Sequence, residues 1–243
     1  MKYIIFGAGS TLAQTTIKKL LNRGDEVCGV LHHNISSGLC EIPYICNVDM
    51  SNPSITHDII KKTEHLFGIP DHFISCVGKS KYHNFTNDSL QQWYKVFEAN
   101  YYSCVNTTYI ATQLLQKHDN GGSIVVIGSG YGIRHIPYLS SYCASKGALL
   151  SFVRTLSTEL GGRIRINLVT PGLFPSNMTK EFIENNKYIE QLLAHIPDKR
   201  IGNADEISDT ILFLTSNSAK HINGAEIIVD GGMLNLIEGG IIR

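Results

Sequence analysis

The chain has 243 residues, 43% of them hydrophobic, and its 21 basic side chains balance its 21 acidic ones. This length suits one large domain or two small ones, and the lack of net charge provides no attraction toward nucleic acid or an anionic membrane. No apolar run approaches the roughly 20 residues of a membrane helix. We therefore expect a cytoplasmic protein that binds neither nucleic acid nor membrane.

Six cysteines are scattered along the chain without a C-x-x-C pair or a histidine spacing typical of zinc sites. We expect reduced structural thiols and no metal site. Cys143 stands beside Tyr142, but a lone cysteine without an adjacent base is typical of a small buried filler and not of a nucleophile.

Short apolar runs alternate with amphipathic stretches from the first residue onward. Strands are predicted over 2–6, 26–31, a short run before residue 47, 71–77, 122–128, 163–172 and 225–232. Helices are predicted over 10–24, 53–68, 89–118, 139–161, about 178–194 and 204–216. Continuously apolar strands separated by helices predict an α/β fold, a Rossmann-type doubly wound parallel sheet with helices on both faces. Because no linker or repeat divides the chain, a single domain over 1–243 is expected.

Glycine-rich or polar turns follow these strands, where open parallel sheets bind their ligands. The turns read GAGST, HHN, NVD, CVGKS, GSGYG and TPGLFPS in chain order. The first turn lies between a strand and a helix, so its backbone N–H groups and the helix dipole are able to hold the pyrophosphate of a dinucleotide. A glycine-rich turn without a phosphate is the alternative.

Tyr142 and Lys146 stand four residues apart in a predicted helix, and therefore on one face of it. A cation within about 4–6 Å favours the phenolate by one to three pKa units, which makes a tyrosine useful as an acid or base. Ser129, thirteen residues before Tyr142, follows another strand and could hold the same substrate oxygen. A solvated Tyr–Lys pair is the alternative reading of the motif alone.

Over nearly its whole length the chain resembles the short-chain dehydrogenase/reductase family, in particular its compact members that include the 3-oxoacyl-carrier-protein reductases. The resemblance rests on FGAGSTLA, VFEANYYS, IVVIGSG, YCASK, INLVTPGLFPSNM and RIGNADEISDTILFLTSNSAKHINGAEIIVDGG. It implies four catalytic residues, Asn100, Ser129, Tyr142 and Lys146, with Asn100 holding a water in a proton relay and Lys146 gripping the nicotinamide ribose. The cofactor-binding positions that it implies are Gly7, Gly9, Ser10, Thr11, Leu12, His32, Asn47, Val48, Gly78, Tyr142, Lys146, Pro171, Gly172 and Ser176.

The activity expected from this resemblance is NAD(P)-dependent interconversion of a carbonyl and a secondary alcohol by hydride transfer, with Tyr142 as general acid or base. The substrate would be a small carbonyl or alcohol compound, linked to an acyl carrier if the protein is a 3-oxoacyl reductase. The alternatives are a dehydrogenase of a sugar or nucleotide-sugar hydroxyl and a non-catalytic dinucleotide-binding protein.

Three departures from the family pattern stand out. Thr11 and Ala13 replace two glycines of the usual turn, so looser cofactor binding is expected. SCVG, residues 75–78, replaces the usual N-N-A-G, so hydrogen bonding around Asn100 must be arranged differently. Asn47 replaces a frequent carboxylate, and its amide oxygen can still contact an adenine amino group.

At the end of the second strand the chain has Leu31, His32 and His33 instead of the acid that NAD-selective members use to bind the adenosine ribose. A protonated histidine can attract the 2′-phosphate of NADP, and an ordinary imidazole loses its proton near pH 6.5. We therefore predict a modest preference for NADP that weakens as the pH rises, with NAD as the alternative.

The resemblance also predicts a substrate lid and an assembly. Residues 173 to about 196 are expected to form the lid, with Phe174, Phe182, Ile183 and Leu192 as candidate pocket residues and ordinary packing as the alternative for each. Separately, Arg134 and His135 are candidate partners for an acid group of the substrate, although a solvated loop is the preferred interpretation. A homotetramer is expected through the helices near residues 89 and 140, with the tail past Gly232 at another interface.

Overall fold

The sheet of this protein has seven parallel strands in the order β3-β2-β1-β4-β5-β6-β7. The structure is a computed structural model that describes residues 1–34 and 38–235. The strands are β1 (Lys2–Phe6), β2 (Glu26–Val30), β3 (Tyr44–Ile45), β4 (His72–Ser75), β5 (Gly122–Ile127), β6 (Ile164–Pro171) and β7 (Glu226–Val229). The predicted α/β fold with one doubly wound parallel sheet is confirmed.

The eight described α-helices connect these strands. They are α1 (Thr11–Asn22), α2 (Thr56–Phe67), α3 (Leu90–Phe97), α4 (Ser103–Leu115), α5 (Ser140–Glu159), α6 (Lys180–Ile183), α7 (Asn186–Ala194) and α8 (Ala204–Thr215). Short helical turns add η1 (Pro53–Ile55), η2 (Glu98–Tyr102), η3 (Gly130–Gly132), η4 (Asn217–Ala219) and η5 (Met233–Asn235).

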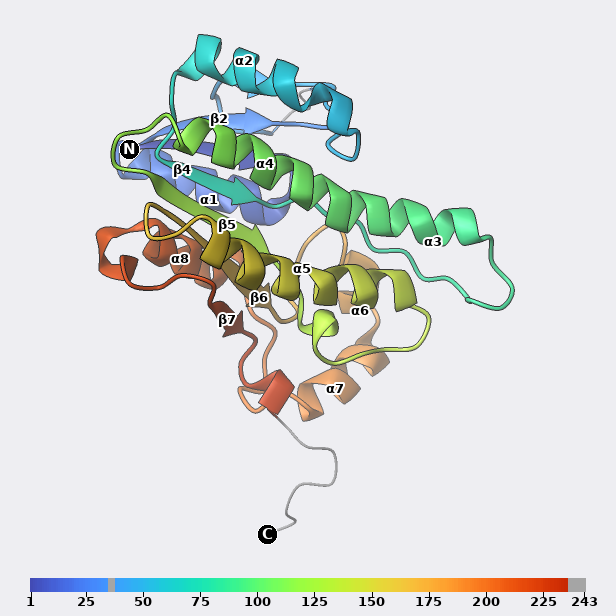
Figure 1. Cartoon of the computed structure of the whole chain (residues 1–243). Helices are drawn as coiled ribbons and strands as arrows, with labels where there is room; N and C mark the ends of the chain where they lie inside the picture. The colour runs from blue at the N-terminus through green and yellow to red at the C-terminus, as the bar shows by residue number, and fades with distance from the viewer. Residues whose placement is uncertain (35–37, 236–243) are drawn as a thin grey trace.

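Helices cover both faces of the sheet because successive strand residues point to opposite sides. Ile4 and Phe6 of β1 pack in a core with α2, α4 and α5, whereas Tyr3 and Ile5 pack in a second core with α1 and α8. Figure 1 shows the two layers, with α2, α4 and α5 in front of the strands and α1 and α8 behind them. These strands are therefore buried on both sides, as their uninterrupted apolar sequences predict.

Two predicted helices are divided in the structure. The helix expected over 89–118 contains a π-helical turn, η2, in which Ser103 N–H donates to the Glu98 carbonyl five residues back. Single π-turns inside α-helices often mark functional sites, and this one carries Asn100. The helix expected near 178–194 is split into α6 and α7.

The strand order reverses between β1 and β4, so the connections after these two strands leave in opposite directions. In open α/β sheets this reversal produces a crevice outside the carboxyl ends of the strands. The loops after β1, β4, β5 and β6 all meet at this edge of the sheet.

Candidate active site

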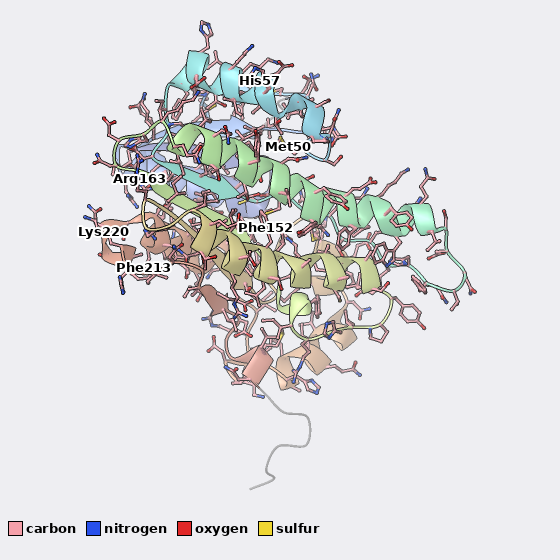
Figure 2. The ribbon with its side chains drawn as sticks, viewed as in Figure 1. Met50, His57, Phe152, Arg163, Phe213 and Lys220 are labelled. Carbon is pink, nitrogen blue, oxygen red and sulfur yellow. The ribbon has the colours of Figure 1, made fainter. Side chains whose placement is uncertain are left out.

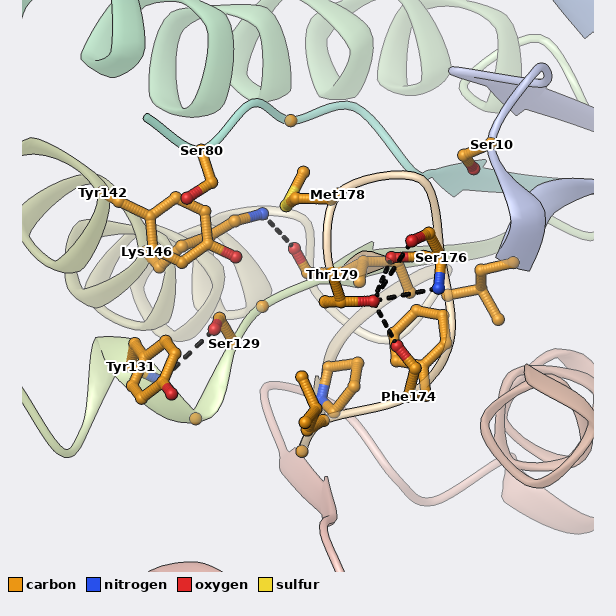
Figure 3. A pocket seen from close by; sticks show the side chains of 18 of the residues that line it. Ser10, Ser80, Ser129, Tyr131, Tyr142, Lys146, Phe174, Ser176, Met178 and Thr179 are labelled. Atoms are coloured by element: carbon orange, nitrogen blue, oxygen red, sulfur yellow. Dashed lines mark hydrogen bonds between the residues drawn. The ribbon is translucent and has the colours of Figure 1, made fainter. Parts of the chain in front are cut away.

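A cavity of about 330 Å³ lies at the carboxyl ends of the strands. Its wall combines the loops after β1, β4, β5 and β6 with the start of α5 and the segment that leads into α6 (Figure 3). A volume of this order is typical of a small-molecule site. The predicted site residues in its wall are Ser10, Thr11, Leu12, Gly78, Ser129, Tyr142, Lys146, Pro171, Gly172 and Ser176.

Tyr142 and Lys146 occupy successive turns of α5 and point toward the cavity (Figure 3). Lys146 Nζ lies 6.0 Å from the centroid of the Tyr142 ring and donates a hydrogen bond of 2.8 Å to the Ile127 carbonyl at the end of β5. Both side chains are nearly buried, with 8% and 5% exposure. The small residues around them, Ser141 and Ser145, are fully buried and allow α5 to pack closely.

Ser129 enters the cavity from the turn after β5. Its backbone is extended, and its hydroxyl caps η3 by accepting the Tyr131 N–H at 3.2 Å. Figure 3 shows the Ser129 hydroxyl on the cavity side of η3, between Tyr131 and Tyr142. The serine and tyrosine hydroxyls therefore border the same space, where one substrate oxygen can contact both.

Asn100 lies behind this group and is completely buried. Its side chain accepts the Lys79 N–H at 2.7 Å, and its amide donates to the Lys79 carbonyl at 3.0 Å and to Ser145 Oγ at 2.9 Å. It thus ties the loop after β4 to α5, next to Lys146. A Cβ on Gly78 would lie 3.2 Å from Asn100 Oδ1 and 3.4 Å from Lys146 Nζ, so the missing side chain at Gly78 preserves this contact.

The hydrogen bonds around Asn100 follow the different arrangement that the SCVG sequence of residues 75–78 predicts. Ser75 Oγ is 2.9 Å from Thr107 Oγ1 of α4, and the Asn100 side chain supports the loop through the Lys79 backbone. The Asn100 side chain therefore acts as a clamp between elements. The proton relay through a water at Asn100 stays a prediction.

The turn after β1 has the shape that a pyrophosphate requires. Gly7 has a φ of +71°, and a Cβ there would lie 2.8 Å from the Cys76 carbonyl oxygen. Ser10 caps α1 by accepting the Ala13 N–H at 3.3 Å. Thr11 and Leu12 at the first turn of α1 border the cavity, where helix N–H groups without intrahelical partners can bind an anion. These residues fit a dinucleotide.

Comparison with known proteins decides the family. The family model described as "Enoyl-(Acyl carrier protein) reductase" matches residues 10–234. The 3-oxoacyl-[acyl-carrier-protein] reductase of Thermotoga maritima is 28% identical over 242 residues, covering 95% of this chain and 96% of the relative. The chain belongs to the short-chain dehydrogenase/reductase family.

Solved structures of the same fold include two dehydrogenases. The aldohexose dehydrogenase of Thermoplasma acidophilum superposes with a TM-score of 0.90 at 21% identity and covers 100% of this chain and 96% of that one. A 4-hydroxyisoleucine dehydrogenase complexed with NADH gives a TM-score of 0.88 at 23% identity, covering 98% and 100% of the two chains. At this identity the likeness shows the fold.

As a member of this family the chain is an NAD(P)-dependent oxidoreductase that acts on CH–OH groups and carbonyls. This sets aside the alternative of a non-catalytic dinucleotide-binding protein. The resemblance inferred from FGAGSTLA, YCASK and the other motifs is confirmed.

The pKa of Tyr142 differs from the expectation. Burial raises it above its ordinary value, and the hydrogen bond with Ser129 lowers it only in part. The expected depression by Lys146 is not found, because the ammonium lies 6.0 Å from the ring and is bonded to the Ile127 carbonyl. Tyr142 is therefore protonated at neutral pH in this structure, which suits a proton donor.

Lys146 is itself altered by burial. Desolvation of its ammonium lowers the pKa to about 8, against the smaller opposing influences of Cys104 and Cys76. A lysine with such a pKa carries its charge at neutral pH and loses it in mildly alkaline solution.

The expected contacts to the adenosine lie outside the cavity wall, at the ends of β2 and β3. His32 and His33 are exposed and stack edge to face at 4.4 Å between ring centroids. Asn47, with a φ of 57°, donates to Asn34 Oδ1 at 2.9 Å. Buried Val48 donates its N–H to the Leu31 carbonyl, and a Cβ on Gly9 would lie 3.3 Å from the Leu31 side chain.

An acid that sequence reading missed stands at this place. Asp49 Oδ1 lies 3.9 Å from His32 Nε2. Hydrogen bonds from Ser51 hold the pKa of the Asp49 carboxyl below its usual range, with a smaller contribution from His32. The expectation that no acid lies at the end of β2 is therefore wrong. The pairing of β2 with β3 brings Asp49, the last residue of the NVD turn after β3, beside His32.

The segment that was expected to form a lid contributes part of the cavity wall, and its role as a lid stays a prediction. Phe174 and Phe182 line the cavity, whereas Ile183 borders a shallow neighbouring hollow and Leu192 lines neither. Arg134 donates to the Met233 carbonyl at 3.2 Å and is not in the wall. Pocket residues that sequence reasoning missed are Ser80, Tyr82, Tyr131, Leu139, Met178 and Met233.

Among the described residues there is no cluster of histidine, cysteine or acidic side chains suited to a metal ion, and no helix long and apolar enough to cross a membrane. All six cysteines are free. Met233 of η5 lies in the cavity wall, and residues 236–243 of the tail, which was expected at an interface, lie outside the described residues.

Proposed function

We propose that the chain forms one catalytic domain over residues 1–243 that reduces a small ketone or oxidises the corresponding secondary alcohol, with Asn100, Ser129, Tyr142 and Lys146 as its reaction centre. The observation that carries this proposal is the shared cavity wall of Ser129, Tyr142 and Lys146 beside the glycine turn and the first turn of α1. Asn100 clamps the loop and helix that position Lys146.

The roles of the side chains follow from their chemistry. A reduced nicotinamide, when bound, supplies the hydride that reaches the carbonyl carbon. Ser129 donates a hydrogen bond to the carbonyl oxygen and so favours the negative charge that develops on it. Tyr142 gives its phenolic proton to that oxygen. The Lys146 cation then stabilises the resulting phenolate, and its ammonium hydrogens are suited to bind the ribose hydroxyls of the nicotinamide.

The direct test follows the absorbance of NADPH or NADH in a panel of ketones and alcohols. At least one uncharged ketone should be reduced, with kcat/KM lost when Ser129 is replaced by alanine. Activity that is indifferent to Ser129→Ala would contradict the proposed centre, because the serine hydroxyl would then not contact the reacting oxygen.

For the cofactor we propose a modest preference for NADPH, supported by His32 and opposed by Asp49. NADPH binding should weaken between pH 6 and pH 8 while NADH binding stays nearly constant. Asp49→Asn removes a carboxylate near His32 and should raise the NADPH to NADH affinity ratio about fivefold. His32→Gln should lower the ratio. Titration of cofactor fluorescence gives both dissociation constants, and an NADH preference at both pH values would refute the proposal.

For the assembly we propose a homotetramer with two-fold axes. Helix α5 packs against α3 and η2, and its Phe152 (Figure 2) lies against Tyr101 of η2 at 6.1 Å between ring centroids. Tyr102 and Tyr109 of the same layer are about half exposed, at 51% and 52%. Light scattering should give four times the 26.9 kDa chain mass, and a monomer mass at micromolar concentration would contradict the assembly.

The cytoplasm is the proposed location, because six free thiols suit a reducing compartment. For the substrate, the Thermotoga maritima relative suggests a 3-oxoacyl group linked to an acyl carrier, whereas the Thermoplasma acidophilum neighbour suggests a sugar. The side chains of the cavity wall bear on the choice between these two substrate classes.

A further inference from the structure

The cavity wall has a distinctive electrostatic character. Among the residues that the structure describes, its lining contains no aspartate, glutamate, arginine or histidine, and Lys146 is the one cationic side chain. That ammonium already donates to the Ile127 carbonyl. A substrate ammonium, or a carboxylate that lies away from Lys146, would therefore be buried without an opposite charge among the described wall residues, at a large cost.

A group of apolar and aromatic side chains in the cavity wall comes from segments other than the glycine turn. They come from four separate parts of the chain and are Tyr82, Tyr131, Leu139, Met178, Phe182 and Met233. The wall also carries neutral polar groups, namely the Ser80 hydroxyl, which Figure 3 places beside Tyr142, the Asn177 amide, and the hydroxyls of Ser10, Thr11, Tyr82, Ser129, Tyr131, Tyr142, Ser176 and Thr179. A polyhydroxylated substrate would leave hydroxyls facing the carbon side chains of Leu139, Met178, Phe182 and Met233, where a lost hydrogen bond is not replaced.

An aromatic pair bridges this part of the cavity. Tyr82, from the loop after β4, and Phe182, from α6, have ring centroids 5.3 Å apart at an angle of 44°. The loop is anchored next to Tyr82, because His83 is buried and its Nε2 lies 2.9 Å from Ser141 Oγ, one residue before Tyr142. The rim of the cavity is thus attached to the helix that carries the candidate acid.

The α6 side of the pair is anchored as well. Thr179, one turn before Phe182, donates to the Phe174 carbonyl at 2.6 Å and accepts the Ser176 N–H at 2.9 Å (Figure 3). Phe182 N–H in turn donates to the Thr179 carbonyl. Both rings therefore project from braced segments and offer a defined apolar surface.

We propose that the substrate is an uncharged ketone, or the matching secondary alcohol, with an extended alkyl or aromatic group that packs against Tyr82 and Phe182. This rests on the proposed function and narrows it to acyl-like or aryl substrates, against sugars, sugar acids and amino acids. In the reduction, a hydride from NAD(P)H forms the new C–H bond. The Tyr142 proton forms the O–H bond as the carbonyl π bond breaks.

The test compares methyl ketones of increasing length, from 2-butanone to 2-heptanone, with 6-oxoheptanoate as the charged match of 2-heptanone. We expect kcat/KM to rise about fourfold per methylene, the factor for one buried CH₂. The charged match should be at least about a hundredfold poorer than 2-heptanone. Any of three results would overturn the inference. They are a kcat/KM that does not rise with chain length, a kcat/KM for 6-oxoheptanoate within about tenfold of that for 2-heptanone, and faster oxidation of an aldohexose than of 2-heptanol.

Variants assign the effect to the aromatic pair. Phe182→Ala and Tyr82→Ala should each lower kcat/KM for 2-heptanone at least about tenfold. The loss for 2-butanone should be at least about threefold smaller than the loss for 2-heptanone, and circular dichroism shows whether the variants fold. Phe182→Leu should restore most of the loss. Phe85→Ala, in the same loop but 60% exposed and outside the cavity wall, is the matched control. Equal losses for both ketones would overturn the role of the pair.

The two possible failures are distinguishable. Ketone reduction that requires Tyr142 but shows no length dependence contradicts this inference alone. No ketone reduction under any condition, or reduction that is independent of Tyr142, contradicts the proposed function and the inference with it.

Discussion

Replacing Tyr142 with phenylalanine should lower kcat for carbonyl reduction at least about a hundredfold, the scale of a general acid contribution. Only the hydroxyl is removed, because the ring stays in its cluster with Val96, Leu139 and Cys143. Cofactor dissociation constants should therefore change by no more than about twofold. Steady-state kinetics and titration of cofactor fluorescence measure the two quantities separately.

Tyr138→Phe is the control for this variant. Tyr138 lies four residues before Tyr142, just ahead of α5, but is 61% exposed and outside the cavity wall. It should retain wild-type kinetics. If Tyr142→Phe keeps more than about a hundredth of the wild-type rate, Tyr142 is not the proton donor.

Replacing Lys146 with methionine should abolish measurable turnover and weaken cofactor binding, yet stabilise the fold. Burial lowers the Lys146 pKa from 10.5 to about 8, so the folded protein carries a destabilised charge at neutral pH. The shift corresponds to roughly 3 kcal/mol, and loss of the bond to the Ile127 carbonyl offsets about 1 kcal/mol of the gain. The net of about 2 kcal/mol should raise the melting temperature by about 4–8 °C at pH 7.

The stability difference between Lys146→Met and the wild type should depend on pH. Below pH 8 both folded and unfolded wild-type chains bind the Lys146 proton, and the full penalty is present. Between pH 8 and 10.5 the folded chain has lost this proton while the unfolded chain retains it, so wild-type stability rises with pH. The advantage of Lys146→Met should therefore shrink between pH 8 and pH 10.

Calorimetry of the variant and the wild type at pH 7 and pH 10 measures this difference. Lys220→Met is the control, because Lys220 is exposed at the end of η4 (Figure 2) and its replacement should change stability by less than about 0.5 kcal/mol. A melting temperature of Lys146→Met below that of the wild type at pH 7 would show that the buried charge is not a net cost.

The expected loss of activity with a gain of stability has a physical origin. A cation near a reacting oxygen is effective only where water is largely excluded, and that exclusion is what destabilises it in the folded chain. Lys146 meets this condition at the carboxyl end of β5, held by one backbone carbonyl.

The sequence by itself determined the order of strands and helices, the glycine turn after β1 and the common face of Tyr142 and Lys146. These features depend on periodicity and on neighbours within one helical turn or one strand, which the order of residues encodes directly. The family resemblance then indicated Ser129 and Asn100, although these residues lie on different elements.

The local environment of those residues was decided only by the tertiary structure. The raised pKa of Tyr142 depends on burial by α5 and its neighbours, and the carboxylate of Asp49 reaches His32 through the pairing of β2 with β3. The contact of Tyr82 with Phe182 joins residues a hundred positions apart. Such effects arise from desolvation and from contacts between distant segments, which no local pattern in the chain encodes.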